Sequence, residues 1–367
     1  MPNTPYQHIV LDYYVERLRQ LRAQRRERLD RIRTPAQART YQREIRRAIR
    51  RAMAPRPRKT ALAARVTGAT EDRYCRIENI LLQSRPGCLV SANLYLPRNL
   101  SNRIPAVLGA CGHDAKGKEA AIYQAFCQRL ACAGFAVLIY DPFNQGERDQ
   151  YWRLADKTPV ASCTHAHNMM GKQLELNGEF FGMWRAWDGI RALDYLLARP
   201  EVDPNHVGLT GNSGGGTLTT WLWPIEQRIT MAAPSCFVTT FLANLENELP
   251  DFLIARAPDP VLLLGQTYDF FDRRGLREAY DEVARFYEIL GAPTANRDLF
   301  IGPQGHGFSR HNQKAMVQFF AHHAGLPNPT KVRRPPQLGS AALDSTPEGN
   351  TIAAGATPIY QLIATHA

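Results

Sequence analysis

From residue 105 to residue 325, short apolar runs alternate with stretches that carry apolar residues at helical spacing. We expect buried strands at 105–113, 136–143, 207–211, 229–235, 260–266 and 298–302. Between and after them we expect helices at 120–135, 181–200, 277–291 and 312–325. A strand followed by a helix and another strand favours parallel neighbours. The alternation therefore predicts an α/β protein with a doubly wound, mostly parallel sheet.

The regions on either side of this alternation differ from it in composition. Two runs at 75–83 and 88–97 predict a hairpin, because the intervening SRPG carries both turn-forming residues. The tail from Pro327 is rich in Pro, Gly and Ser and predicts a linker or a surface strap, ending in a short apolar helix that docks or begins a further module. We divide the chain into a basic helical segment at 1–59, a catalytic domain at 60–326 and this tail at 327–367.

The net charge of +11 belongs to one segment. Residues 1–60 hold 17 Lys and Arg against 5 Asp and Glu, whereas the rest of the chain holds 28 against 29. Val10, Tyr14, Leu18 and Leu21 share one face of a predicted helix. We expect this segment to pack on the main domain or on a partner subunit, which would make a homo-oligomer. An arm for RNA or an anionic surface is the alternative, but nucleic-acid binding lacks support from interleaved aromatics or a known module.

The cysteines and the apolar runs indicate the redox environment of the protein and whether it spans a membrane. Seven cysteines, an odd number without a Cys-x-x-Cys pair, indicate neither a disulfide framework nor a zinc site. The first twenty residues do not resemble a secretory signal, and no apolar run is long enough to span a membrane. We therefore expect a cytoplasmic, reduced protein without a membrane partner, with secretion as the alternative if a signal has been removed from the given sequence.

One serine lies among four glycines in VGLTGNSGGGTLTTWL, residues 207–222. Gly211, Ser213 and Gly215 match the Gly-x-Ser-x-Gly turn, in which a nucleophilic serine sits on a strained connection between a strand and a helix. A loose connection would also be rich in glycine, so the motif alone is a weak signal.

Ser213 gains support from an acid and a histidine farther along the chain. A serine hydroxyl needs a base within hydrogen-bond reach and a third group that orients the base. Asp269 and His306 each follow a predicted strand, in the order serine, acid, histidine that hydrolases of this sheet type use. Asp272 is the alternative acid, and we prefer Asp269 because it comes sooner after its strand.

An oxyanion hole is expected from two loops. Gly214 directly follows the nucleophile, and the loop CGHDAKGK supplies Gly112 and His113. The lysines of that loop do not fit a phosphate-binding motif. His165 and His167 lack a third ligand at fixed spacing, so we expect no metal and no cofactor.

The chain resembles bacterial α/β-hydrolases of the acetyl xylan esterase family. The similar stretches include CGHDAKGKEAAIYQAF, YDPFNQGERDQY, RAWDGIRALDYLLARPEVD, GLTGNSGGGTLT and GPQGHGFSR, within residues 60–325. The resemblance implies an α/β-hydrolase fold, a triad of Ser213, Asp269 and His306, and an oxyanion hole around Gly112, His113 and Gly214. Two departures are Tyr268, where the family usually has a second Asp, and a short segment at 237–258.

These observations favour a serine carboxylic-ester hydrolase that forms an acyl-enzyme on Ser213. The resemblance implies a deacetylase of acetylated carbohydrate or of other short acyl esters. A prolyl-oligopeptidase-like peptidase shares the sheet and the triad, but no repeat array for a gating domain precedes the predicted catalytic domain. A non-catalytic, nucleic-acid-associated protein that uses the Arg-rich segment is the third hypothesis.

Overall fold

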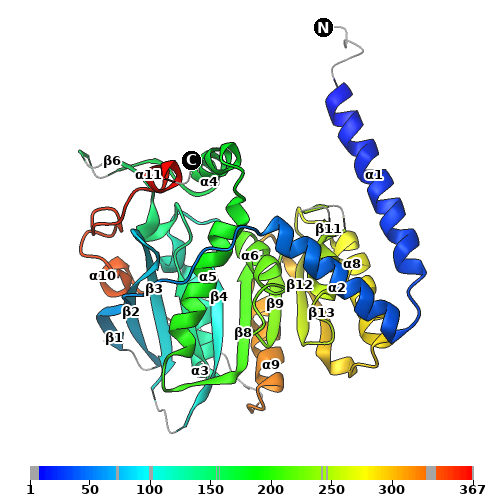
Figure 1. Cartoon of the computed structure of the whole chain (residues 1–367). Helices are drawn as coiled ribbons and strands as arrows, with labels where there is room; N and C mark the ends of the chain where they lie inside the picture. The colour runs from blue at the N-terminus through cyan, green and yellow to red at the C-terminus, as the bar shows by residue number, and fades with distance from the viewer. Residues whose placement is uncertain are drawn as a thin grey trace.

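A computed structural model describes residues 8–71, 74–98, 102–153, 155–156, 158–240, 243–244, 247–327 and 336–365. Its centre is a nine-stranded sheet with the strand order β1-β2-β3-β5-β4-β8-β9-β12-β13 (Figure 1). The strands are β1 Arg65–Glu71, β2 Cys75–Arg85, β3 Cys88–Pro97, β4 Ile104–Ala110, β5 Ala136–Tyr140, β8 Val202–Asn212, β9 Met231–Ser235, β12 Val261–Tyr268 and β13 Arg297–Gly305. The strands from β5 to β13 in this order run parallel, and β1, β2, β3 and β5 pair antiparallel. The predicted α/β-hydrolase fold is confirmed.

Helices cover both faces of the sheet, as a mostly parallel sheet requires. They are α3 Ala121–Cys132, α4 Cys163–Leu176, α5 Phe181–Leu197, α6 Gly214–Leu222, α7 Leu249–Ile254, α8 Arg273–Ile289 and α9 Arg310–His323. The larger core cluster packs α5, α6 and α8 on one face, for example through Trp187, Leu218 and Val283. The second cluster packs α3 and α9 on the other face through Phe126 and Met316. None of the described helices is long and apolar enough to cross a membrane.

Short elements complete the connections. They are the hairpin strands β6 Tyr151–Arg153 and β7 Thr158–Ala161, the strands β10 Ala243–Asn244 and β11 Asn247–Glu248, and single turns at η1 Gly117–Glu119, η2 Gly146–Arg148 and η3 Thr294–Asn296. Part of the short segment at 237–258 lies outside the described residues, and its described end forms α7, whose residues are all buried.

The two N-terminal helices are α1 Ile9–Asp30 and α2 Pro35–Ala52, and they meet the domain differently. Helix α2 begins at a capping box between Thr34 and Gln37 and buries one face, including Tyr41, Ile45 and Ile49. In contrast, α1 projects away from the body of the molecule and buries only Leu29 (Figure 1).

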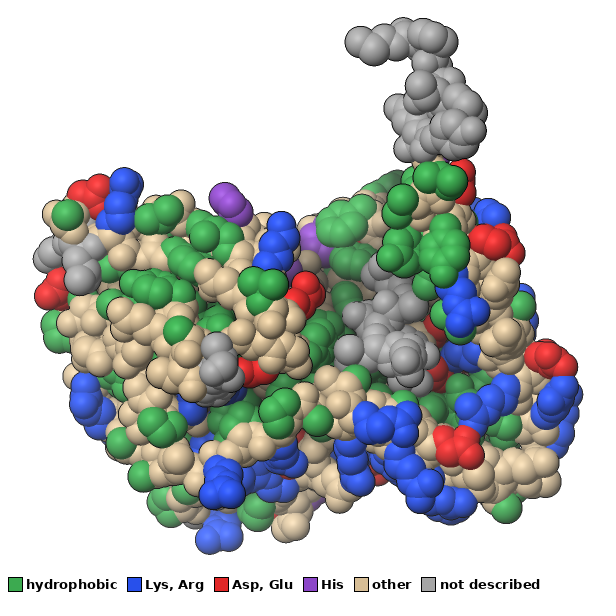
Figure 2. Space-filling view, turned by 45° about the horizontal axis from the view of Figure 1, so that its top comes forward, with side chains coloured by type: hydrophobic (Ala, Val, Ile, Leu, Met, Phe, Trp, Pro, Cys, Tyr) green, Lys and Arg blue, Asp and Glu red, His purple; other side chains and the backbone are tan. Residues whose placement is uncertain are grey.

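The expected apolar face of α1 does not pack on the domain. Val10, Tyr14, Leu18 and Leu21 are 66, 60, 45 and 41% exposed, and Figure 2 shows the apolar side chains of the first turns below the grey N-terminus. Packing of this face on the main domain, one of the two predicted arrangements, is therefore wrong, and packing on a partner subunit stays a prediction.

Arginines make the contact that α1 does have with the domain. The Arg25 guanidinium binds Asp251 at 2.8 and 2.9 Å and Glu282 at 2.8 Å, and Arg22 binds Glu278 at 2.8 Å. Arg22 and Arg25 share a face with Leu29, three and four residues apart along the helix. This contact face carries Arg22 and Arg25 as well as Leu29, whereas the apolar spacing of Val10, Tyr14, Leu18 and Leu21 marks exposed residues nearer the N-terminus of the helix.

The C-terminal tail crosses the surface as a strap, one of the two forms predicted for it. Its described part contains α10 Ser340–Leu343 and α11 Ile359–Ala364. Leu343, Ile359 and Ile363 are buried against the domain. The backbone N–H groups of Ser345 and Thr346 donate to the buried Glu147 carboxylate, whose oxygens lie 2.7 to 2.9 Å away. A buried carboxylate needs such partners, so the tail completes the fold.

Candidate active site

Ser213 lies on a sharp turn between β8 and α6. Its backbone has φ 57° and ψ −119°, a conformation that a residue with a side chain adopts at a cost of about 1–3 kcal/mol. A Cβ on Gly211 or Gly215 would lie 2.5 or 2.2 Å from the carbonyl oxygen of Ala110. These two positions need glycine because the turn presses against the end of β4.

Asp269 and His306 lie together at the carboxyl ends of β12 and β13. The Nδ1 atom of His306 is 2.8 Å from Oδ1 of Asp269, whose side chain is 1% exposed. Burial raises the pKa of Asp269, but hydrogen bonds from His306, from the backbone N–H of Phe271 and from Cys236 bring it below its ordinary value. The carboxylate is therefore charged and oriented toward the imidazole.

The alternative acid, Asp272, has a different role. Its side chain accepts a hydrogen bond from the backbone N–H of Arg274 and caps the start of α8. It also binds the Arg274 guanidinium at the surface. The structure thus brings Asp269 to His306 and leaves Asp272 at a helix terminus.

A chain of contacts connects Ser213 to the histidine loop. The Ser213 N–H donates to the carbonyl oxygen of Ser235 at 2.9 Å. The next residue, Cys236, contacts the carbonyl oxygen of Gly307 at 3.5 Å and lies beside Asp269 and His306. Within the described residues the Ser213 hydroxyl makes no hydrogen bond, and bonds between nucleophile and base are often long before substrate binds.

Aromatic rings form an open rim on the His306 side. The rings of Phe270 and His306 are 4.2 Å apart between centroids, and Phe271 packs at 5.8 Å. Phe270 is 74% exposed and the neighbouring Tyr268 is 77% exposed. Exposed aromatic side chains beside a potential base offer a surface to a ligand.

The other side of the site is formed by the loop after β4. Gly112 is so close to the β8 turn that a Cβ there would lie 2.3 Å from the Asn212 carbonyl oxygen. The imidazole of His113 covers Gly214, and a Cβ on Gly214 would lie 2.8 Å from its Cε1 atom. All three predicted oxyanion-hole residues therefore lie next to Ser213.

Two further residues support this side, and our reading of the sequence did not assign them to the site. His167, from α4, has its Nδ1 atom 3.2 Å from Nε2 of His113 and its Nε2 atom 2.7 Å from the carbonyl oxygen of Phe143. The buried Arg185, from α5, donates to the carbonyl oxygen of Gly214 at 3.2 Å. His167 was considered only as a metal ligand, and nothing in the local sequence distinguishes Arg185 from other helix arginines.

The two histidines on this side are held neutral. Desolvation by the surrounding protein, together with the positive charge of Arg185, lowers the pKa of His113 to about 4 and that of His167 to about 3. Above about pH 5 neither ring carries a charge.

A metal ion would have one group of potential ligands among the described residues. Ligand atoms of Cys236, Asp269 and His306 lie within 4.8 Å of one another. However, burial raises the pKa of the Cys236 thiol to about 12, and Asp269 is already hydrogen-bonded to His306. At neutral pH a protonated thiol and an engaged carboxylate do not favour metal binding.

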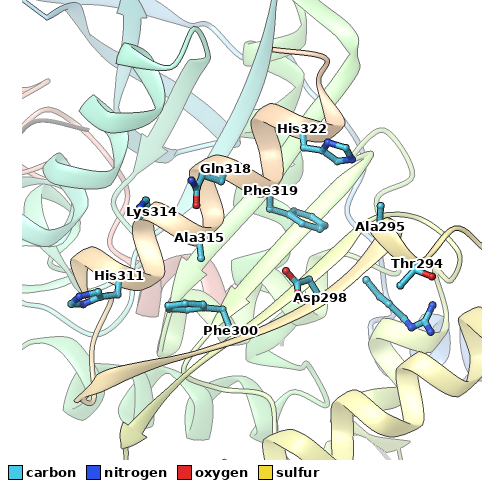
Figure 3. A pocket seen from close by; sticks show the side chains of 11 residues that line it. Thr294, Ala295, Asp298, Phe300, His311, Lys314, Ala315, Gln318, Phe319 and His322 are labelled. Carbon is cyan, nitrogen blue, oxygen red and sulfur yellow. The ribbon is translucent and has the colours of Figure 1, made fainter. Parts of the chain in front are cut away.

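A cavity of about 670 Å³ lies apart from these residues, between β13 and α9 (Figure 3). It is lined by His311 and His322, which the sequence analysis did not assign to the site, and by Phe300 and Phe319. None of the predicted site residues lines it, so its size does not make it the candidate active site.

Comparisons with known proteins agree with this fold. No protein-family model matches the chain. The chain is 25% identical over 170 residues to the Putative hydrolase YtaP of Bacillus subtilis (strain 168), and this match covers 44% of the chain and 52% of that relative. The chain thus matches about half the length of this curated relative.

The solved structures that resemble the chain include several esterases. Methylesterase BT1017 has a TM-score of 0.71 at 20% identity, covering 90% of this chain and 74% of that one. A crystal structure named a putative acetyl xylan esterase (BF1801), from Bacteroides fragilis NCTC 9343, has a TM-score of 0.58 at 17% identity, covering 73% and 76%. Glucuronoyl esterases are also among the neighbours. The predicted resemblance is confirmed, and in its fold the chain is an esterase-like α/β hydrolase.

Proposed function

We propose that the chain is a serine ester hydrolase that removes short acyl groups, with acetylated carbohydrate as the substrate class. The observation that carries the proposal is the 2.8 Å contact between His306 Nδ1 and the buried Asp269 carboxylate. Both residues follow the carboxyl ends of their strands, as does the strained turn of Ser213. A carboxylate that holds one ring nitrogen leaves the other nitrogen free to take a proton from a serine hydroxyl.

The proposed reaction has two steps. The Ser213 oxygen attacks the ester carbonyl carbon while His306 Nε2 takes the serine proton, and then His306 returns a proton to the departing alcohol. Backbone N–H groups of Gly214 and of the loop at 112–113 would stabilise the negative charge on the carbonyl oxygen. Water activated by His306 then releases the acid from the Ser213 acyl-enzyme.

The carbohydrate part of the proposal has two supports. The exposed ring of Phe270 lies beside His306, the exposed Tyr268 pairs in the sheet with Gly305, and aromatic rings pack well against the C–H faces of a sugar. Similar structures are named for esters of carbohydrates, among them acetyl xylan and glucuronoyl esters. In an acetylated sugar the carbohydrate is the alcohol part of the ester, whereas in a glucuronoyl ester it is the acid part.

The other two hypotheses find less support. Arginines of the basic segment are engaged in ion pairs within the chain, among them Arg22, Arg25 and Arg28, which makes them less available to a nucleic acid. No observation favours a peptide substrate over an ester.

A substrate panel tests the proposal. We expect turnover of p-nitrophenyl acetate and of a monoacetylated methyl xyloside to exceed turnover of a peptide amide by orders of magnitude. Ser213→Ala is the matched control and should remove both ester activities. Turnover of a glucuronic acid methyl ester far above that of the acetylated sugar would move the substrate class to uronate esters. Equal turnover by Ser213→Ala would contradict the serine mechanism.

A further inference from the structure

The hydrogen bonds of His167 fix the position of its proton. A backbone carbonyl oxygen can only accept, so the Nε2 atom that lies 2.7 Å from the Phe143 oxygen must carry the hydrogen. In a neutral imidazole the other nitrogen is then an acceptor. The Nδ1 atom of His167 therefore presents a lone pair to its neighbour.

The proton of His113 is fixed in turn. Its Nε2 atom lies 3.2 Å from this lone pair and must donate to it. Because His113 is also neutral, its Nδ1 atom carries no hydrogen and is an acceptor. The Phe143 carbonyl thus determines, through two rings, which nitrogen of His113 has a free lone pair.

The ring that carries the free lone pair lies over Gly214, the residue directly after Ser213. A Cβ on Gly214 would be 2.8, 3.0 and 3.1 Å from Cε1, Nδ1 and Nε2 of His113. The residue His113 as a whole is exposed, although its imidazole packs against His167 and Gly214, and in the described part of the chain no group donates a hydrogen bond to its Nδ1. The backbone beneath the ring is also held, because Arg185 donates to the Gly214 carbonyl oxygen and Gln145 donates to that of Gly112.

An acceptor at this position suits one kind of ligand group. A carbonyl oxygen or an oxyanion needs a donor, so the side chain of His113 cannot stabilise it in this tautomer. A hydroxyl group can donate, and a sugar that carries an ester has hydroxyls on the neighbouring carbons. We propose that Nδ1 of His113 accepts a hydrogen bond from a substrate hydroxyl next to the scissile ester, so that this residue selects polyol esters over plain alkyl or aryl esters. This inference rests on the proposed function and assigns a specificity-determining residue to it.

The first test compares two substrates that differ by one hydroxyl. These are a monoacetylated methyl xyloside and its analogue in which the adjacent hydroxyl is replaced by hydrogen. The wild-type protein should prefer the hydroxylated substrate, and His113→Phe should lower the ratio of the two kcat/KM values about tenfold, the worth of one hydrogen bond. A ratio that stays the same in His113→Phe, because both substrates lose equally, would overturn the proposal and assign His113 a structural or oxyanion role.

Variants of His167 provide a second test of the same proposal. Gln at position 167 can donate to the Phe143 oxygen and accept from His113, so His167→Gln should keep the substrate preference. Leu can do neither, so His167→Leu should lose part of the preference. Equal ratios of the two kcat/KM values in His167→Gln and His167→Leu would contradict the proposal that the hydrogen bond from His113 to His167 fixes the tautomer of His113.

Nuclear magnetic resonance of the ¹⁵N-histidine-labelled protein reads the tautomer without any substrate. Nδ1 of His113 should be unprotonated from about pH 5 to pH 8, and a protonated Nδ1 would overturn the proposal. Failure of the proposed function has a different signature, since the wild-type protein would then hydrolyse neither ester whatever the tautomer of His113.

Discussion

Two histidines of the candidate site, His306 beside Asp269 and His113 beside Gly214, have partners of opposite character. The ring of His306 contacts a buried carboxylate, which stabilises the positive charge that a general base acquires. The ring of His113 contacts a second neutral histidine and lies near the buried Arg185, both of which oppose a positive charge. The comparison teaches that the partner of the second ring nitrogen decides whether a histidine takes protons or only accepts hydrogen bonds.

Removal of His306 and removal of His113 should differ most in their effect on activity. His306→Ala should lower kcat for p-nitrophenyl acetate by about 10⁵- to 10⁶-fold, because nucleophile and base act as a unit. His113→Ala should cost far less on this substrate, which has no hydroxyl to bind. Steady-state kinetics checks both, with His311→Ala, at the cavity between β13 and α9, as the control. A larger loss in His113→Ala than in His306→Ala would exchange the two roles.

Changes at the carboxylates test what orients His306. Asp269→Asn should lower kcat by about 10⁴-fold while the fold is retained, because an amide no longer holds the imidazole in the productive tautomer. Asp272→Asn is the matched change three residues away. It should alter kcat little, since Asp272 caps α8 and does not touch His306. The reverse ranking in kinetic assays would make Asp272 the acid.

The neutral state of His167 in the folded protein should affect how the free energy of unfolding depends on pH. His167 has a pKa near 6.5 when unfolded and about 3 when folded, so the unfolded state binds more protons between these values. The free energy of unfolding should therefore decrease as the pH falls from about 6.5 toward about 3, by at most about 1.4 kcal/mol per pH unit from this group.

His167→Gln isolates this contribution, because glutamine does not titrate. Denaturant unfolding at pH 7, 6, 5 and 4 should give a flatter pH dependence for the variant than for the wild-type protein. The raised pKa values of Asp149 and Asp344, both about 6, act with the opposite sign but are common to the two proteins and cancel in the difference. Parallel curves for the two proteins would mean that His167 is not held neutral by burial.

Much of the fold and part of the site follow from the sequence, for physical reasons. The sheet is predictable because buried parallel strands are continuous apolar runs, and the residues that follow them gather at one edge. Ser213, Asp269 and His306 could be named on that basis, and the glycines around Ser213 indicated a sharp turn between a strand and a helix.

The rest depends on packing between distant segments. His167 reaches the site from α4, inside a long irregular connection, and its contact with His113 has no signature in local spacing. Helix α1 contacts the domain mainly through Arg22 and Arg25, which bind carboxylates on α8 and α7. The tail becomes a strap because Glu147 needs its backbone N–H groups, which no composition rule encodes.

The most direct test of the central claim is covalent labelling of the proposed nucleophile. An organophosphonate should label the wild-type protein at Ser213, as read by mass spectrometry of the digested protein, and should abolish ester turnover. Ser213→Ala should not be labelled, and its turnover should be lower by several powers of ten. A small residual turnover above the rate in water is expected. Full turnover together with retained labelling in Ser213→Ala would contradict the account and place the nucleophile elsewhere.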